Sequence, residues 1–149
     1  MKGRTLAVIL TFLLFVATLG QALRWRDRMA ASRLLARVEA LTLAAFRADR
    51  VPVKLMADNL EALQKAERMN PVEVGIPTAR GTQYLFLGRP ETAIGSYGDA
   101  LALEPQSVGY FALGRAQWIA GQREEARRSF ANALRLDPTL ARELPPGAQ

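Results

Sequence analysis

The sequence predicts an all-helical protein, in which an N-terminal transmembrane helix is followed by a short right-handed array of helical hairpins. Two observations predict this class. An uncharged stretch of 19 residues lies near the N-terminus, and a pattern of small, aromatic and proline residues recurs after 33 positions in the C-terminal half. The chain of 149 residues has room for one domain and an appendage rather than for two independent cores.

The candidate membrane span is the segment 5–23, which follows a short tail at 1–4. As a helix its uncharged residues would reach about 28 Å, close to the hydrocarbon thickness of a bilayer. This length favours a retained anchor over a cleaved secretory signal. Cleavage stays an alternative because Gly20, Gln21 and Ala22 form a small-x-small site, and a buried core helix is a third reading that we rank last.

The net charge of +6 is concentrated beside this span. Residues 1–23 carry +2 and residues 24–37 carry +4, whereas the other 112 residues have 13 basic and 13 acidic side chains. A nucleic-acid-binding domain needs its cationic face on the folded module, so the balance argues against a nucleic-acid partner. The segment 24–39 is predicted to be a basic juxtamembrane helix, with membrane-proximal residues Arg24, Trp25, Arg26, Arg28 and Arg33. We prefer an ordinary stop-transfer flank, which is compatible with weak lipid contact.

The flanking charges leave open the side of the membrane on which the domain lies. Five basic residues follow the span and two precede it, which slightly favours a cytoplasmic domain. The short basic N-terminal tail resists translocation, which is typical of an outward, periplasmic domain. The preference for arginine over lysine, 17 to 3, is typical of GC-rich genomes and favours a bacterial source. Together with the apolar span it predicts a single-pass protein of a bacterial inner membrane.

The segment 40–73 is predicted to form a degenerate helical hairpin. Residues 30–50 lack proline and glycine and place apolar side chains at steps of three and four, as in a helix that could continue the span. Pro52 suits the first turn of a second helix, which Asn70 and Pro71 end.

Two further hairpins are predicted at 74–106 and 107–140, followed by a capping segment and tail at 141–149. Small residues permit antiparallel helices to approach closely, and glycine permits the left-handed backbone that ends the first helix. Aromatic, alanine and proline residues pack and close each unit. The repeat-packing residues are Gly81, Gly88, Ala93, Tyr97, Ala100 and Pro105, with their equivalents Gly114, Gly121, Ala126, Phe130, Ala133 and Pro138.

This pattern resembles the tetratricopeptide repeat (TPR) family, whose motif is matched by Tyr110-x-x-Leu113-Gly114 and the later positions of that unit. The unit at 74–106 departs from the motif at Pro77 and Arg80, where large apolar residues are usual. The resemblance implies an interaction module that binds a protein partner in a concave groove lined by the first helix of each hairpin.

The groove positions that the resemblance implies are mainly apolar and aromatic. They are Thr78, Thr82, Leu85, Phe86, Phe111, Arg115, Trp118 and Ile119. The Lys, Asn and Arg set with which some family members bind a peptide carboxylate is absent, and only Arg115 is a charged candidate. We expect the partner to present an apolar helix or extended segment, with Phe111 and Trp118 as anchors. The alternative is that a neighbouring hairpin or the capping segment covers these side chains.

The composition argues against catalysis. The chain has no cysteine and no histidine, which removes thiolate nucleophiles, Cys/His zinc sites and the usual proton carrier. The sequence has no phosphate-binding loop or nucleophile elbow, and the acid pair Glu124 and Glu125 falls at a helix start, where acids favour the dipole. We expect no enzyme activity, no cofactor, no metal and no small-molecule substrate.

The predicted function is a membrane-anchored protein–protein interaction module: a scaffold, accessory subunit or assembly factor of a membrane or envelope complex. Its expected partners are proteins, chiefly integral membrane proteins, together with membrane lipids around the N-terminal helix. Two alternatives stay open. One is a structural subunit of a membrane-protein complex with no separable ligand, and the other is an exported soluble adaptor after signal cleavage.

Overall fold

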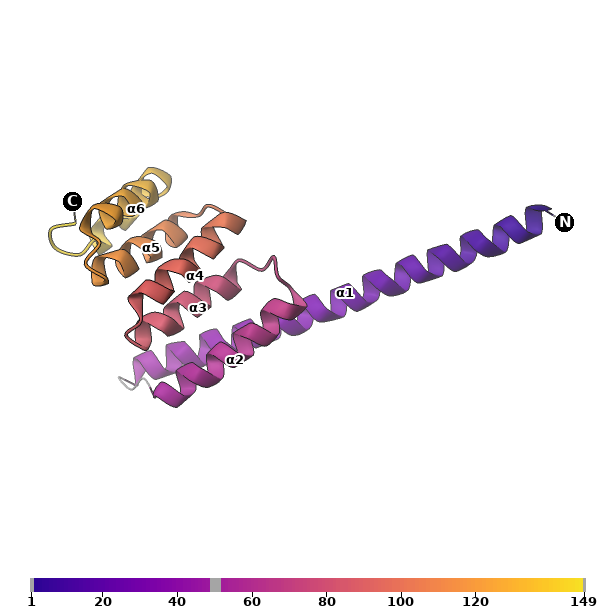
Figure 1. Cartoon of the computed structure of the whole chain (residues 1–149), viewed down its shortest axis with the longest axis horizontal. Coiled ribbons are helices and arrows are strands. Elements are labelled where there is room, and N and C mark those ends of the chain that lie inside the picture. The colour runs from indigo at the N-terminus through magenta and orange to yellow at the C-terminus, as the bar shows by residue number, and fades with distance from the viewer. Residues whose placement is uncertain (1, 49–51, 149) are drawn as a thin grey trace.

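The computed structural model describes residues 2–48 and 52–148, and that part of the chain is all-helical, as predicted. Consecutive helices pack against one another, so that the C-terminal part of α1 pairs with α2, α3 with α4 and α5 with α6 (Figure 1). The elements are α1 (Lys2–Arg47), α2 (Val53–Met69), α3 (Gly75–Phe86), α4 (Pro90–Leu103), α5 (Ser107–Ile119), α6 (Arg123–Leu136) and the 3₁₀ helix η1 (Pro138–Glu143).

Helix α1 is uninterrupted and joins the apolar N-terminal stretch to the folded domain (Figure 1). Its C-terminal part enters the core, where Ala31, Leu35 and Val38 are buried against Leu63 and other residues of α2 and α3. This packing begins ahead of residue 40, within the segment predicted as a basic juxtamembrane helix. The spacing of the three buried residues places them on one side of α1, while the arginines between them stay exposed.

A contact between a glycine and an aromatic ring holds the two helices together in both the second hairpin, α3 and α4, and the third, α5 and α6. A Cβ on Gly81 would lie 2.7 Å from Tyr97 Cε1, and a Cβ on Gly114 would lie 2.7 Å from Phe130 Cδ1. Both aromatic rings are buried, with Tyr97 2% and Phe130 1% exposed. Glycine is therefore needed on the first helix because the ring of the second helix occupies the space of a side chain.

The backbone explains two further features of these hairpins. Gly88 and Gly121 follow the first helices with φ values of 68° and 82°, in the left-handed region that favours glycine. Pro77, a departure from the family motif, is the third residue of α3. Its missing N–H lies in the first turn and removes no intrahelical hydrogen bond, so proline is compatible with the helix.

A buried polar cluster joins the first hairpin to the second. Gln83 Nε2 and Asn59 Nδ2 donate to Thr42 Oγ1 at 3.0 and 3.4 Å, and Asn59 Nδ2 also lies 3.2 Å from Gln83 Oε1. Thr42 Oγ1 donates in turn to the carbonyl of Val38 at 2.8 Å. Buried amides without partners are costly, so these bonds fix how α1, α2 and α3 fit together.

The chain after α6 folds back onto the last hairpin. The Asp137 carboxylate accepts hydrogen bonds from the Thr139 hydroxyl at 2.6 Å and the Thr139 N–H at 3.0 Å, and these bonds lower the pKa of Asp137. They hold the start of η1. Beyond η1, Ala148 is 3% exposed and packs in one cluster with Phe111 and Phe130.

Replacing Gly114 by alanine tests the helix contact. The new Cβ would meet the buried Phe130 ring, so we expect a loss of about 1–3 kcal/mol in the free energy of unfolding, typical of an overpacked core. Gly95→Ala is the control, because a Cβ at Gly95 in α4 meets nothing within 4 Å. It should stabilise the helix by about 0.5–1 kcal/mol. Urea unfolding followed by circular dichroism measures both, and shifts of the same sign would contradict the contact.

Candidate functional site

Six of the eight predicted groove residues line two separate hollows, both on first helices of hairpins, whereas Leu85 and Phe111 line neither. The first hollow, of about 290 Å³, lies between α1 and α3. Its rim is apolar and open, with Leu43 49%, Phe46 66% and Phe86 36% exposed. Its lining residues are Val38, Glu39, Thr42, Leu43, Phe46, Thr78, Ala79, Thr82, Gln83 and Phe86. Sequence reasoning named three of these on α3 and missed the wall that α1 supplies.

The hydroxyl groups of the first hollow are already hydrogen bonded. Thr78 Oγ1 donates to the carbonyl of Val74 at 2.9 Å, and Thr82 Oγ1 donates to the carbonyl of Thr78 and lies 3.2 Å from the Tyr97 hydroxyl. Burial raises the pKa of Tyr97, and this rise is opposed by the Thr82 bond and by the charge of Arg115. A ligand of this hollow would therefore be held mainly by apolar contact.

The second hollow, of about 360 Å³, lies between α5 and the chain at the end of η1 and just after it. It is lined by Arg115, Trp118, Ile119, Glu143 and Pro145. Ile119 is 60% exposed. The guanidinium carbon of Arg123 lies 3.8 Å from the centroid of the Trp118 ring, a cation–π contact that covers part of this aromatic surface.

Phe111 was predicted to anchor a partner, but its side chain is only 6% exposed. Its ring centroid lies 5.4 Å from that of Phe130, with the planes tilted by 54°, and Ala148 packs in the same cluster. Phe111 is therefore covered, as expected in the alternative in which a neighbouring hairpin or the capping segment covers these side chains. Leu85, also a predicted groove residue, is half-buried against the cluster that contains Tyr97 and Ala116.

The predicted membrane-proximal residues surround α1 between the apolar stretch and the folded core. Trp25 is 67% exposed. Arg24, Arg28 and Arg33 are exposed as well, and Arg26 pairs with Asp27 at 3.2 Å. Side chains on all sides of the helix are thus accessible to a lipid or protein surface.

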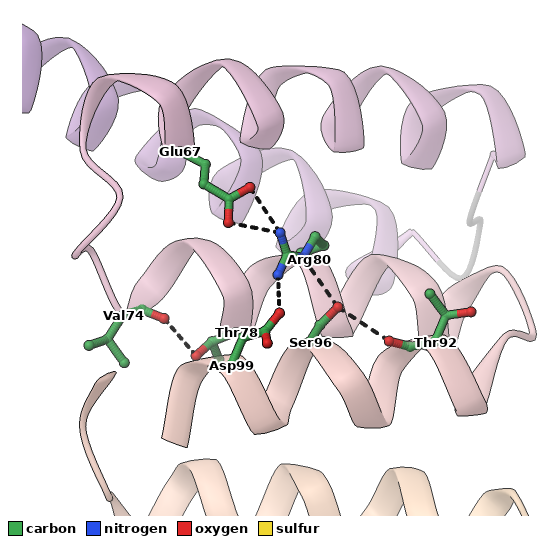
Figure 2. A network of polar contacts seen from close by, with 7 residues as sticks. All are labelled: Glu67, Val74, Thr78, Arg80, Thr92, Ser96 and Asp99. Atoms are coloured by element: carbon green, nitrogen blue, oxygen red, sulfur yellow. Dashed lines mark hydrogen bonds and ion pairs between the residues drawn. The ribbon is translucent and has the colours of Figure 1, made fainter. Parts of the chain in front are cut away.

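Arg80 is the centre of a polar cluster that contains Glu67, Ser96 and Asp99 (Figure 2). Its Nη1 lies 2.9 and 3.0 Å from the Glu67 carboxylate of α2, and its Nη2 lies 2.6 Å from Asp99 of α4. Its Nε donates to Ser96 Oγ at 3.2 Å. The guanidinium, 21% exposed, replaces the usual apolar residue of the motif with ion pairs that join three helices.

The side chains of this cluster bond to one another. Each of the three guanidinium nitrogens of Arg80 has a hydrogen-bond partner. A hollow of about 420 Å³ beside the cluster is lined by Leu60, Glu61, Gln64, Glu67, Arg80 and Tyr84. Within residues 2–48 and 52–148, no group of three or more His, Cys, Asp or Glu side chains is placed to hold a metal ion.

Residues 108–140 match the family model described as tetratricopeptide repeat. No curated protein shows a significant sequence match. The first TPR domain of human RPAP3 is 20% identical, with a TM-score of 0.64, and the match covers 74% of this chain and 81% of that domain. The family model identifies one tetratricopeptide repeat at residues 108–140, and the similar solved structures show an all-helical, TPR-like fold.

Two further solved structures are similar. The first TPR of Spaghetti (RPAP3) bound to the HSP90 peptide SRMEEVD is 20% identical, with a TM-score of 0.63, over 74% of this chain and 82% of that one. TTC0263, a thermophilic TPR protein of Thermus thermophilus, is 29% identical, with a TM-score of 0.66, over 80% of this chain. This chain spans 62% of that protein. TPR domains are generally interaction modules rather than enzymes.

The ion pairs of Arg80 should contribute more than an exposed pair does. Arg80→Ala leaves two carboxylates without their shared cation, so we expect a loss of about 1–3 kcal/mol in the free energy of unfolding. Arg127→Ala is the control, because the Arg127–Glu124 pair at 2.7 Å is exposed on one helix and should contribute less than about 1 kcal/mol. Urea unfolding at low salt measures both. Equal losses would show that the Arg80 pairs are no stronger than a surface pair.

Proposed function

We propose that this chain is a membrane-anchored interaction module, a scaffold, accessory subunit or assembly factor, that binds an apolar segment of a protein partner between α1 and α3. The observation that carries the proposal is the open apolar rim of Leu43, Phe46 and Phe86. Large apolar side chains grouped around a hollow are typical of recognition surfaces. The TPR relationship supports protein binding, since one similar domain is known bound to a peptide.

The charge of the hollow favours an apolar partner over an acidic one. The peptide SRMEEVD bound by the RPAP3 domain is acidic. The described residues that line the α1–α3 hollow include no Lys or Arg, and Glu39 is among them. An acidic segment would meet repulsion there, so we expect recognition through aromatic and aliphatic contacts.

The anchor rests on the N-terminal part of α1. By length and composition α1 can cross a membrane from Ile9 onward, and none of its apolar window is buried. The same helix forms a wall of the hollow. Leu23, at the end of the apolar stretch, lies about 22 Å along the helix from Val38, at roughly 1.5 Å per residue. The hollow would therefore lie close to the membrane surface, where an integral membrane protein of the same complex can supply the partner segment.

The anchor is tested by alkaline carbonate extraction of membranes from cells that make the full chain. The unchanged protein should stay in the membrane pellet with residues 1–23 intact by mass spectrometry. Leu13→Arg should release it, since a charge at the centre of a span costs about 2.5–3.5 kcal/mol. Trp25→Arg, outside the stretch, is the control. A mature protein that begins at Leu23 would replace the anchor by a cleaved signal.

Photo-cross-linking tests the hollow. We expect a photoreactive phenylalanine analogue at Phe46 to cross-link an integral membrane protein in detergent-solubilised membranes, and Leu43→Ser to abolish that product. Because Leu43 is 49% exposed, this change should leave stability almost unaltered. The same analogue at Val53, 69% exposed and outside the hollow, is the control. The same products at both positions, or none at Phe46, would argue for a structural subunit without a ligand in this hollow.

A further inference from the structure

The segment 144–148, Leu-Pro-Pro-Gly-Ala, covers part of the groove face of α5, around Phe111. Leu144 packs against the cluster of Phe111 and Phe130, and Ala148 is buried within it. Pro145 lines the second hollow together with Trp118. The chain thus places its own apolar residues on predicted groove positions.

The segment has the geometry of a compact turn. The Ala148 N–H donates to the Pro145 carbonyl at 3.1 Å, and Gly147 has a φ of 77°. Proline at the second position and a glycine with positive φ at the third are typical of a type II turn. The turn brings Leu144 and Ala148 onto the same cluster, so it presents two apolar side chains to α5 and α6.

Equivalent groove positions of the second and third hairpins differ in whether they are covered. Thr78 and Phe111 are equivalent positions, 33 residues apart. Thr78 lines the open α1–α3 hollow, whereas Phe111 is covered in the cluster that contains Ala148. The groove face is therefore accessible at Thr78 of α3 and covered at the equivalent Phe111 of α5.

The segment is held by few interactions. Pro146 and Gly147 are exposed, Leu144 and Pro145 are half-buried, and only Ala148 is fully buried. Segments with few buried contacts open at a small fraction of the cost of global unfolding. Opening would expose Phe111 and free one side of Trp118, the two aromatic residues expected to anchor a partner.

We propose that the α5 face is a second recognition surface, specific for a leucine followed by a proline–glycine turn and a small residue. Segment 144–148 occupies this surface within the same chain, and a partner segment of the same chemistry displaces it. This inference rests on the proposed function, because it adds a second subsite and its regulation to the same groove. A tethered segment competes at an effective concentration of about millimolar, so a partner must exceed that competition.

The test uses the full chain in detergent with Trp25→Phe, so that Trp118 is the only tryptophan, and compares it with the same chain ending at Glu143. The shortened chain should keep its helix content, while Trp118 emission shifts to the red and acrylamide quenching rises. The peptide Glu143–Gln149 at millimolar concentration should reverse both changes in a saturable way. It should have no effect on the full chain, and a Leu144→Asp peptide should have no effect on either.

Ala148→Asp in the full chain is the second variant, because it places a charge in the apolar cluster without removing residues. It should open the segment, whereas Ala131→Asp, at an exposed position of α6, should not. The proposal is overturned if Trp118 is unchanged in both open variants, if helix content falls with the quenching change, or if the peptide fails to rebind. The tryptophan experiment uses no partner protein. A negative result would therefore overturn the second surface without affecting the proposed function, which the cross-linking at Phe46 tests separately.

Discussion

The burial of one side of α1 is the constraint on which the rest of the molecule depends. Ala31, Leu35 and Val38 pack against α2 and α3, and Thr42 completes the polar cluster with Asn59 and Gln83. Without this packing the first hairpin would lose a helix and the α1–α3 hollow would lose a wall. Because the helix is unbroken, the same element also carries the apolar stretch, so any anchoring of that stretch fixes the position of the binding surface.

The repeat could be predicted from the sequence because its physical requirements fall on particular residue types. A buried ring against a helix backbone requires glycine at Gly81 and Gly114, and a helix end with positive φ favours glycine at Gly88 and Gly121. Such requirements recur at one offset and need no knowledge of partners across the fold. The all-helical, TPR-like class followed from them, and the membrane crossing, which rests on apolar length alone, stays a prediction.

The site was less predictable because accessibility depends on residues distant in sequence. Phe111 occupies a groove position, but it is covered by a segment whose buried residue, Ala148, lies far along the chain and has no strong signal. The wall from α1 was missed since the first hairpin lacks the repeat motif. Arg80 departs from the motif in the sequence, and only the structure shows that Glu67 and Asp99 are its charge partners. A local pattern cannot reveal such contacts.

The two groove faces differ in a way that follows from their neighbours rather than from their own residues. The face of α3 borders α1, whose Leu43 and Phe46 leave an open apolar rim. The face of α5 borders η1 and the segment after it, which covers the aromatic surface at Phe111. The apolar side chains of a repeat are stable when a neighbouring element shields them from water. In this chain a short turn, residues 145–148, provides that shield. Its contact with Phe111 and Phe130 therefore stabilises the third hairpin and also covers the groove face of α5 at Phe111.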